Sequence, residues 1–232
     1  MQDLQHLSID AFDYPLPPER IARHPLEQRD KCLLIKAGAP GTAISTHRFD
    51  GLPDLLESGS LLVCNDTRVI NARLRFRKGE MQDGALIEIF CLEPVAPRDY
   101  ALNFASTSGA EWLCFVGNSK RWKEGSLRMT LPDGTTLSAE RTSVTPTGAS
   151  TVRFAWDKPS MSFAEVIEAA GEIPIPPYLN RDTEESDSSD YQTVYSRIDG
   201  SVAAPTAGLH FTPELMDAVR KKGIGVRNLT LH

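Results

Sequence analysis

The sequence predicts an α/β protein with an all-β module inserted into it, and three stretches of the 232-residue chain carry that prediction. A short apolar strand leads into a polar tetrapeptide, Asn65-Asp-Thr-Arg68. From Val69 to about Trp156, strand-like runs follow one another without a helical pattern, and helical periodicity then returns. We therefore expect a discontinuous α/β main domain at residues 1–68 and 157–232, and an inserted β domain at 69–156.

The N-terminal elements are short. Residues 12–22 are too rich in proline for a strand and predict an extended lead-in. A strand is expected at 32–35 and a short helix at 54–57, which Gly59 ends. The strand at 60–64 is almost wholly apolar, which is typical of strands buried on both faces of a mixed or parallel sheet.

The inserted module consists of short strand-like runs separated by polar or glycine-rich turns. Pro132-Asp-Gly134 is a hairpin signal between two of them. Strands at this spacing without helices predict a compact antiparallel barrel or sandwich. The runs are Val69–Phe76, Ala85–Leu92, Trp112–Val116, Ser126–Leu131, Thr135–Ala139 and Val152–Trp156.

Two helices are predicted after the insert. Ser162 and Glu165 form a capping box for the first, which Gly171 ends, and an extended stretch and an acidic loop follow at 173–178 and 182–190. The second helix begins at Thr212 and Pro213 and ends before Gly223. A last strand is expected at 226–231, and a buried-looking strand at the chain end indicates a truncated piece of a longer chain.

Composition excludes several classes of protein. Hydrophobic residues make up 41% and charged residues 24%, which is ordinary for a globular protein. No apolar run is long enough for a membrane span, and residues 1–12 lack the pattern of a secretory signal, so we expect a soluble, cytoplasmic protein. The net charge of −6 alone disfavours nucleic acid as a partner. Five acidic residues lie between Asp182 and Asp190, however, and removing them from the total leaves −1, so the acidity is largely local.

The four cysteines predict no metal centre. None forms a CxxC pair, and three lie in apolar runs, as small buried hydrophobic residues do. The residues are Cys32, Cys64, Cys91 and Cys114.

The densest set of chemically useful residues lies at 200–212. Small residues dominate 201–208, which lets a ligand approach the backbone, and His210 follows just before a helix N-terminus. His210 could act as an acid or base near neutral pH, or could instead cap its own loop through hydrogen bonds. Thr206 is a further polar candidate, whereas Thr212 is first of all an N-cap.

Three other groups allow both a functional and a structural interpretation. Asp66 and Arg68 could contribute to a site or simply pair at a strand end. Tyr191 and Tyr195 could be core aromatics or platforms for a base. Two basic clusters in the β module could track a phosphate backbone or be solvated faces. These clusters are Arg73, Arg75 and Arg77, which alternate on one strand face, and Lys120, Arg121 and Lys123.

Motifs for several enzyme classes are missing. The sequence has no GxGxxG after a strand, no GxxxxGK[ST], no HExxH and no GxSxG. Dinucleotide binding, P-loop chemistry, zinc proteolysis and α/β-hydrolase chemistry therefore have no support in the sequence. A methyltransferase that uses S-adenosylmethionine is disfavoured because its glycine-rich strand-to-helix loop is absent.

Five blocks in the same order closely resemble the S-adenosylmethionine:tRNA ribosyltransferase-isomerase family of queuosine biosynthesis. The resemblance covers nearly the whole chain, and the last block is long and specific. The blocks are Phe12-Asp-Tyr-Pro-Leu-Pro with Ile21-Ala and Gln28-Arg-Asp30, Gly59 to Arg73, Ile175-Pro-Pro-Tyr178, Asp190 to Tyr195, and Gly200 to Thr212.

The resemblance implies a fold and a reaction. The fold is a barrel-like α/β main domain, incomplete here at its C-terminus, interrupted by an antiparallel β-barrel. The reaction transfers and isomerises the ribosyl moiety of S-adenosylmethionine onto prequeuosine in the tRNA anticodon loop to give epoxyqueuosine, and it releases adenine and methionine. No metal is needed, because the sulfonium acidifies the neighbouring C–H bonds. The full-length enzyme is expected to be a monomer.

The resemblance also suggests roles for particular residues. We expect His210 to carry one proton transfer, with Asp66 and Arg68 completing the catalytic set by orienting the substrate. The expected tRNA-binding residues are those of the two basic clusters. The expected substrate-binding residues are Asn65, Thr67, Tyr191, Gln192, Tyr195, Pro205, Thr206 and Gly208.

Members of this family continue beyond His232 into a glycine-rich block and further barrel elements. The resemblance therefore leaves open whether this chain is active alone. The alternative interpretation is a non-catalytic tRNA- or RNA-binding fragment that uses the basic clusters of the β module.

Overall fold

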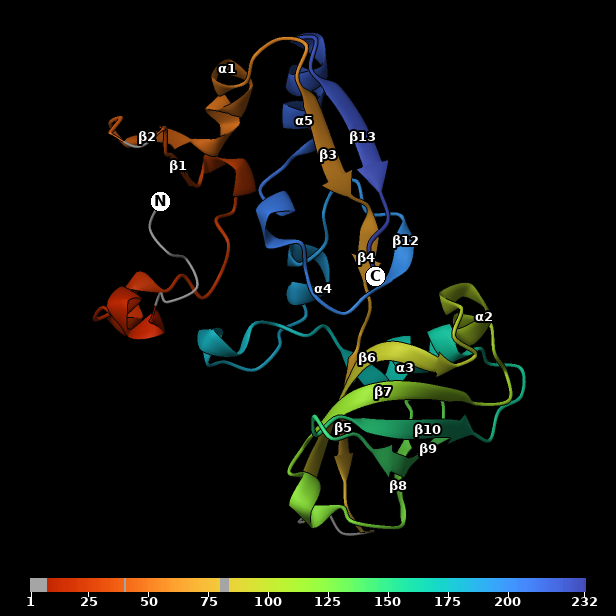
Figure 1. Cartoon of the computed structure of the whole chain (residues 1–232). Helices are drawn as coiled ribbons and strands as arrows, with labels where there is room; N and C mark the ends of the chain where they lie inside the picture. The colour runs from red at the N-terminus through yellow and green to blue at the C-terminus, as the bar shows by residue number, and fades with distance from the viewer. Residues whose placement is uncertain (1–7, 40, 80–83) are drawn as a thin grey trace.

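A computed structural model gives the arrangement of the chain and describes residues 8–39, 41–79 and 84–232. Two regions are visible in Figure 1: a main part built from both ends of the chain, and a β-barrel built from its middle. Part of the segment considered for a secretory signal, residues 1–7, lies outside the described residues.

The main part contains few regular elements. The proline-rich lead-in is extended with 3-10 turns, as predicted, and an antiparallel hairpin of β1 (Leu33–Lys36) and β2 (Ser45–Arg48) follows it. Next come the short helix α1 (Leu52–Leu55) and two consecutive strands, β3 (Leu61–Asn65) and β4 (Thr67–Val69). The C-terminal half of the chain supplies α4 (Asp187–Asp190), β12 (Ile198–Ser201), α5 (Pro213–Lys221) and β13 (Gly225–Leu229).

Parallel pairing joins the two ends of the chain. Strand β13 pairs in parallel with β3, and β12 pairs in parallel with β4 (Figure 1). A small apolar core lies behind β3 and consists of Phe49, Phe211, Leu215 and Met216. Asp66, at the break between β3 and β4, therefore lies where four strands of the main part meet.

The inserted module is a closed antiparallel barrel, which confirms the predicted fold class. Its strands pair in the order β5-β6-β7-β10-β9-β8, and pairing of β5 with β8 closes the ring. Alternate residues point inward, so the core is a column of fully buried side chains such as Trp112, Leu137 and Phe154. The strands are β5 (Arg73–Arg77), β6 (Leu86–Ala96), β7 (Ala110–Gly117), β8 (Ser126–Thr130), β9 (Thr136–Val144) and β10 (Ser150–Trp156).

Helix α3 (Phe163–Ala170) and the two-residue strand β11 (Gly171–Glu172) extend the barrel beyond the predicted insert. The capping box of Ser162 and Glu165 is present, and Phe163, Val166 and Ile167 pack into the barrel core. Strand β11 pairs with β5. The exact domain boundaries stay a prediction, but in packing terms this segment belongs with the barrel.

Two sequence expectations need correction. The strand at 60–64 is not buried on both faces, because Leu61 and Val63 are 61% and 53% exposed while Cys64 on the other face is buried. A short helix, α2 (Tyr100–Phe104), does interrupt the strands of the insert. The acidic loop is tied to the residue before it, since the Asp187 carboxylate is buried and receives two hydrogen bonds from Arg181, of 2.6 and 2.7 Å.

Within the described ranges, no helix is long and apolar enough to cross a membrane. The same residues contain no cluster of three or more histidine, cysteine, aspartate or glutamate side chains arranged to hold a metal ion.

Candidate functional site

Asp66 is the most tightly held of the predicted site residues. It is 2% exposed, and one carboxylate oxygen accepts hydrogen bonds from the Arg197 guanidinium at 2.5 and 3.2 Å while the other accepts one from Thr230 at 2.9 Å. Its backbone oxygen also accepts a hydrogen bond from the Arg197 amide. The hydrogen bonds from Arg197, followed by the one from Thr230, hold the pKa of Asp66 below its usual value.

The simple strand-end pair of Asp66 with Arg68 does not form. Arg68 lies on the exposed side of β4 and approaches Asp199 at 4.0 Å, with both side chains 57% exposed. Asp66 is fixed inside the protein, whereas Arg68 faces solvent, so a ligand could contact Arg68 far more easily than Asp66.

Asn65 and Thr67 contribute mainly to the strand break. The Asn65 side chain accepts hydrogen bonds from the backbone amides of Thr67 and Leu231 and donates one to the Leu231 carbonyl. Thr67 is buried, and its hydroxyl has no hydrogen-bond partner among the described residues. The Asn65–Arg68 tetrapeptide therefore ties β3, β4 and the segment after β13 together.

Gln192 and Tyr195 also have structural contacts. The Gln192 amide group accepts from the Val69 amide at 3.0 Å and donates to the Val69 carbonyl at 2.8 Å, so it pairs with β4 as a neighbouring strand would. Tyr195 packs edge-on against Phe211 with ring centroids 6.2 Å apart. Burial, with a smaller contribution from Cys64, raises the pKa of Tyr195 to about 12. This environment favours the core-aromatic interpretation of Tyr195.

The small-residue loop is shaped by close packing against Tyr195. A Cβ atom at Gly208 would lie 2.2 Å from the Tyr195 hydroxyl oxygen, so this position needs glycine. A 3-10 turn at Thr206–Gly208 follows Pro205, and the Thr212 hydroxyl then caps α5 by accepting a hydrogen bond from the Leu215 amide at 3.1 Å. Between the turn and the cap, the chain presents Leu209 and His210 to a cavity.

This cavity, of about 280 Å³, is where predicted site residues come together. Its walls are mostly apolar, as in pockets that recognise small ligands through a few polar groups. His210, Tyr191 and Thr206 line it. The His210 ring packs at 5.3 Å from the Phe49 ring, and no hydrogen bond to its nitrogens is made by any residue in the described part of the chain. Within the described residues, His210 therefore does not cap its own loop through hydrogen bonds.

Two residues that sequence reasoning did not select as site residues complete the cavity. The lead-in from Ala22 to Leu26 crosses it and contributes His24, which lies 3.9 Å from Glu184. Arg29 donates a hydrogen bond to the Gln192 carbonyl at 3.1 Å and lies 3.8 Å from Asp190. The polar, proline-containing stretch from Arg23 to Asp30 gave no signal for this role, because a surface linker has the same composition.

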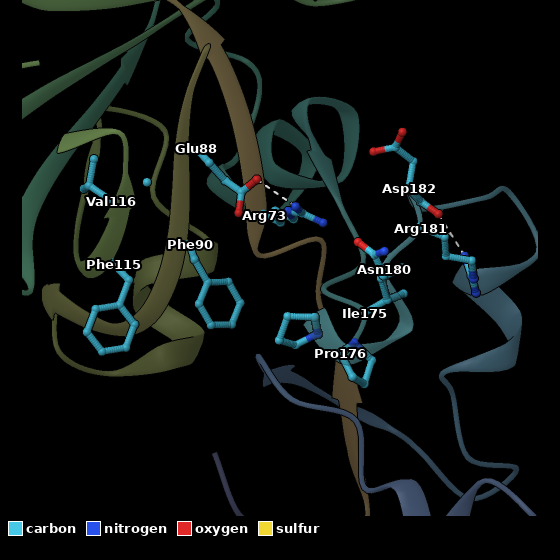
Figure 2. A pocket seen from close by; sticks show the side chains of 12 residues that line it. Arg73, Glu88, Phe90, Phe115, Val116, Ile175, Pro176, Asn180, Arg181 and Asp182 are labelled. Carbon is cyan, nitrogen blue, oxygen red and sulfur yellow. Dashed lines mark hydrogen bonds and ion pairs between the residues drawn. The ribbon is translucent and has the colours of Figure 1, made fainter. Parts of the chain in front are cut away.

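The two basic clusters behave differently from each other and from the prediction. Arg73 and Arg75 do share one face of β5, but both are engaged with carboxylates: Arg73 with Glu88 at 2.7 Å, and Arg75 with Asp182 at 3.2 Å and Glu172 at 3.5 Å. Figure 2 shows Arg73 beside Glu88 on the wall of a second cavity. The Arg73 pair lies within the barrel, between β5 and β6, whereas Arg75 pairs with carboxylates of the segment that follows the barrel.

The remaining basic residues gather at one end of the barrel. Arg77 is directly opposite Arg128 in the β5–β8 pairing, and Lys78 donates a hydrogen bond to the Arg121 carbonyl at 2.8 Å. Trp122, which lies between Arg121 and Lys123 in the sequence, is fully buried in the barrel core. We call this surface the basic barrel end; all its members are exposed, and they are Arg77, Lys78, Lys120, Arg121, Lys123 and Arg128.

Comparison with known proteins identifies the family. The match to the family described as queuosine biosynthesis protein extends over residues 9–232. The chain is 38% identical over 226 residues to the S-adenosylmethionine:tRNA ribosyltransferase-isomerase of Geobacter metallireducens, and 39% identical over 228 residues to that of Novosphingobium aromaticivorans. In both cases the match covers 97% of this chain and 60% of the relative, so the chain spans about 60% of the length of these relatives.

A solved structure is also similar. The crystal structure of an S-adenosylmethionine tRNA ribosyltransferase from Thermotoga maritima matches 95% of this chain and 57% of its own chain, at 29% identity and a TM-score of 0.35.

Proposed function

The chain belongs to the queuosine biosynthesis protein family, and on that premise we propose that it contributes to the activity of an S-adenosylmethionine:tRNA ribosyltransferase-isomerase. In the proposed reaction, the ribosyl moiety of S-adenosylmethionine is transferred to prequeuosine in tRNA and isomerised to give epoxyqueuosine. Adenine and methionine are the leaving products. The proposed setting is the cytoplasm, where tRNA and S-adenosylmethionine are available.

One observation carries the catalytic part of the proposal: His210 borders an apolar cavity with Tyr191 and Thr206, and its ring makes no hydrogen bond within the described residues. An imidazole in that position can exchange a proton with a ligand instead of with the protein. We assign His210 the proton transfer to the departing adenine or from the incoming amine. Tyr191 and Thr206 hold the ligand against it.

Asp66 has an indirect role in this proposal. Its carboxylate is buried and fully occupied by Arg197 and Thr230, so it positions the strand break from which Arg68 extends. Arg29 lines the cavity at His210, and Arg68 lines a neighbouring cavity together with Arg29; we assign these two cations the orientation of an anionic group of the substrate. Neither assignment needs a metal.

The test is release of free adenine from S-adenosylmethionine in the presence of tRNA that carries prequeuosine. It is run with this 232-residue chain and with a longer protein that contains it. Replacing His210 with alanine should slow adenine release by roughly 10²–10⁴-fold, the usual contribution of a general acid or base. His47→Ala is the matched control, because this histidine lies on β2 and contacts Ser45 outside the cavity; its rate should not change. Release that survives His210→Ala would remove His210 from the mechanism.

A second candidate function, tRNA binding without chemistry, is favoured by the basic barrel end. The same experiment distinguishes it from the first. A 232-residue chain that binds tRNA and releases no adenine, while the longer protein does release it, would be the binding part of the enzyme.

A further inference from the structure

One outer face of the barrel carries a cation and two aromatic rings in a row. Strand pairing places Arg73 of β5 beside Phe90 of β6, and Phe90 beside Phe115 of β7. All three lie on the outer face of these strands, because the alternate positions are buried, and Phe90 is half-buried with part of its side chain against the core cluster. Phe115 is 52% exposed, which is unusual for a phenylalanine in a protein with a well-packed core.

This row forms one wall of the second cavity, the one shown in Figure 2. The cavity has a volume of about 810 Å³, and the opposite wall is the stiff segment that follows β11. Figure 2 shows Phe90 and Phe115 on one side and Ile175, Pro176 and Asn180 on the other. We call this space the Phe90–Phe115 cleft; Pro176 also lines the cavity at His210, and the other lining residues of the two cavities differ.

We propose that the Phe90–Phe115 cleft binds a nucleobase of single-stranded RNA. Aromatic side chains on the outer face of a β-sheet or barrel are the surfaces on which unpaired bases stack in RNA- and single-strand-binding proteins. Pro176 and Ile175 supply the second apolar wall. The Asn180 side chain offers both a donor and an acceptor for the polar edge of a base. The cleft is large enough for one nucleotide and lies within the usual range for ligand sites.

The charges of the cleft favour a base over a phosphate as its occupant. Arg73 pairs with Glu88, and Arg181, which also lines the cleft, makes its two short hydrogen bonds to Asp187. These cations are thus already matched by carboxylates, so the cleft is close to neutral inside. A neutral aromatic base fits it, whereas a free anion would meet Glu88 and Asp182 as well as the arginines.

The basic barrel end supplies the place for the phosphates. Strand β5 runs from Arg73 at the cleft to Arg77 at the basic barrel end, and four residues of strand cover about 13 Å. An RNA strand with one base in the cleft can therefore lay its neighbouring phosphates along exposed cations. This inference rests on the proposed function for the choice of RNA as the partner, and it names the place where a loop nucleotide of that RNA is held.

The test measures binding by the 232-residue chain of an RNA hairpin with a single-stranded loop and of the fully paired duplex of the same composition. Phe115→Leu retains an apolar side chain but removes the aromatic face, and it should raise the Kd for the hairpin about tenfold, within the range found for one lost stacking contact. Phe115→Trp should retain hairpin affinity. Val144→Ala is the control, since Val144 is 60% exposed on β9 of the same barrel, and it should change nothing.

Three results would overturn the proposal: an unchanged hairpin Kd in Phe115→Leu, an equal loss for the paired duplex, or a loss of S-adenosylmethionine affinity with RNA binding intact. The last result would mean that the cleft holds the adenine of S-adenosylmethionine. The proposed function is tested separately by adenine release. It fails if the longer protein releases no adenine although the RNA affinity of the 232-residue chain still depends on Phe115.

Discussion

At the scale of single residues, the Asp66 carboxylate shows how the two ends of the chain hold each other. Its partners, Arg197 and Thr230, are 131 and 164 positions away in the sequence. A buried carboxylate needs compensating hydrogen bonds, and here every strong one comes from the C-terminal part of the chain. Asp66 thus couples the β3–β4 break to the strands β12 and β13.

Acid unfolding should report this coupling. The pKa of Asp66 is lowered in the folded protein, mainly by Arg197, so its contribution to stability is present above the unfolded value and is lost as pH falls through the folded value. In Arg197→Gln the folded pKa of Asp66 rises, because the hydrogen bonds that lower it most are lost, and the midpoint of acid unfolding should move to higher pH. Circular dichroism between about pH 6 and pH 2 measures the midpoint.

Arg68→Gln is the matched control for this experiment. It removes an arginine whose carboxylate partner is 4.0 Å away and exposed, a kind of pair that contributes little to stability. Its acid midpoint should equal that of the unmodified chain. Equal midpoints for all three proteins would mean that Asp66 does not depend on Arg197.

The residue scale also shows where sequence reasoning stops. The Asn65–Arg68 tetrapeptide could be selected as polar residues after an apolar strand, and His210 as a histidine between a small-residue loop and a helix. The partners could not be predicted, because Arg197 lies in a stretch with no distinctive pattern and reaches Asp66 only through the parallel pairing of β12 with β4. The contribution of His24 to the cavity likewise depends on the path of an irregular segment.

At the scale of elements, helix α3 closes one side of the barrel. It is only eight residues long, so its stability depends on its cap and on the packing of Phe163, Val166 and Ile167. The Phe163 ring contacts four other aromatic rings, including Trp112 and Phe154. Loosening the first turn of α3 would therefore affect the barrel core.

Removing the cap should have a measurable cost. In the capping box, the Ser162 hydroxyl accepts a hydrogen bond from the Glu165 amide, and the Glu165 carboxylate accepts one from the Ser162 amide at 2.8 Å. Ser162→Ala should lower the free energy of unfolding by about 1 kcal/mol, measured by urea denaturation. Glu165→Gln keeps an acceptor at the same position and should cost less. An unchanged free energy of unfolding in Ser162→Ala would show that the box does not stabilise the helix.

Elements whose signals lie in adjacent residues could be predicted, whereas features that depend on packing against distant parts of the chain could not. The capping box and the start of α5 follow from adjacent residues, and both were predicted. Burial of β3 on both faces was predicted from its apolar residues and was wrong, because Leu61 and Val63 face away from the apolar core. Apolar composition alone does not tell which face another element covers. Attachment of α3 to the barrel likewise required knowledge of the tertiary packing.

At the scale of the whole molecule, barrel closure turns two sequence clusters into one surface. Arg77 and Arg128 are neighbours only because β5 pairs with β8, and Lys78 reaches the Arg121 carbonyl across the same end. The first cluster is split by the same geometry, because Arg73 and Arg75 pair with carboxylates while Arg77 faces outward. The local acidity of the chain lies in the segment 182–190, which follows the barrel, so the net charge of −6 does not describe the basic barrel end.

Arg75 and Arg77 lie on one strand face, but Arg75 pairs with carboxylates whereas Arg77 is exposed, so we expect different effects when each is replaced. Arg77→Glu combined with Lys123→Glu should weaken tRNA binding and reduce the slope of log affinity against log salt by roughly one for each lost phosphate contact. Arg75→Gln should leave that slope unchanged, because its guanidinium pairs with Glu172 and Asp182. Arg153→Glu on β10 is the control for charge reversal itself, since it is exposed but lies beside Glu111 and Glu140. Affinity measured at several salt concentrations separates these cases. An equal slope in the double variant and in Arg153→Glu would show that the basic barrel end is only a solvated face.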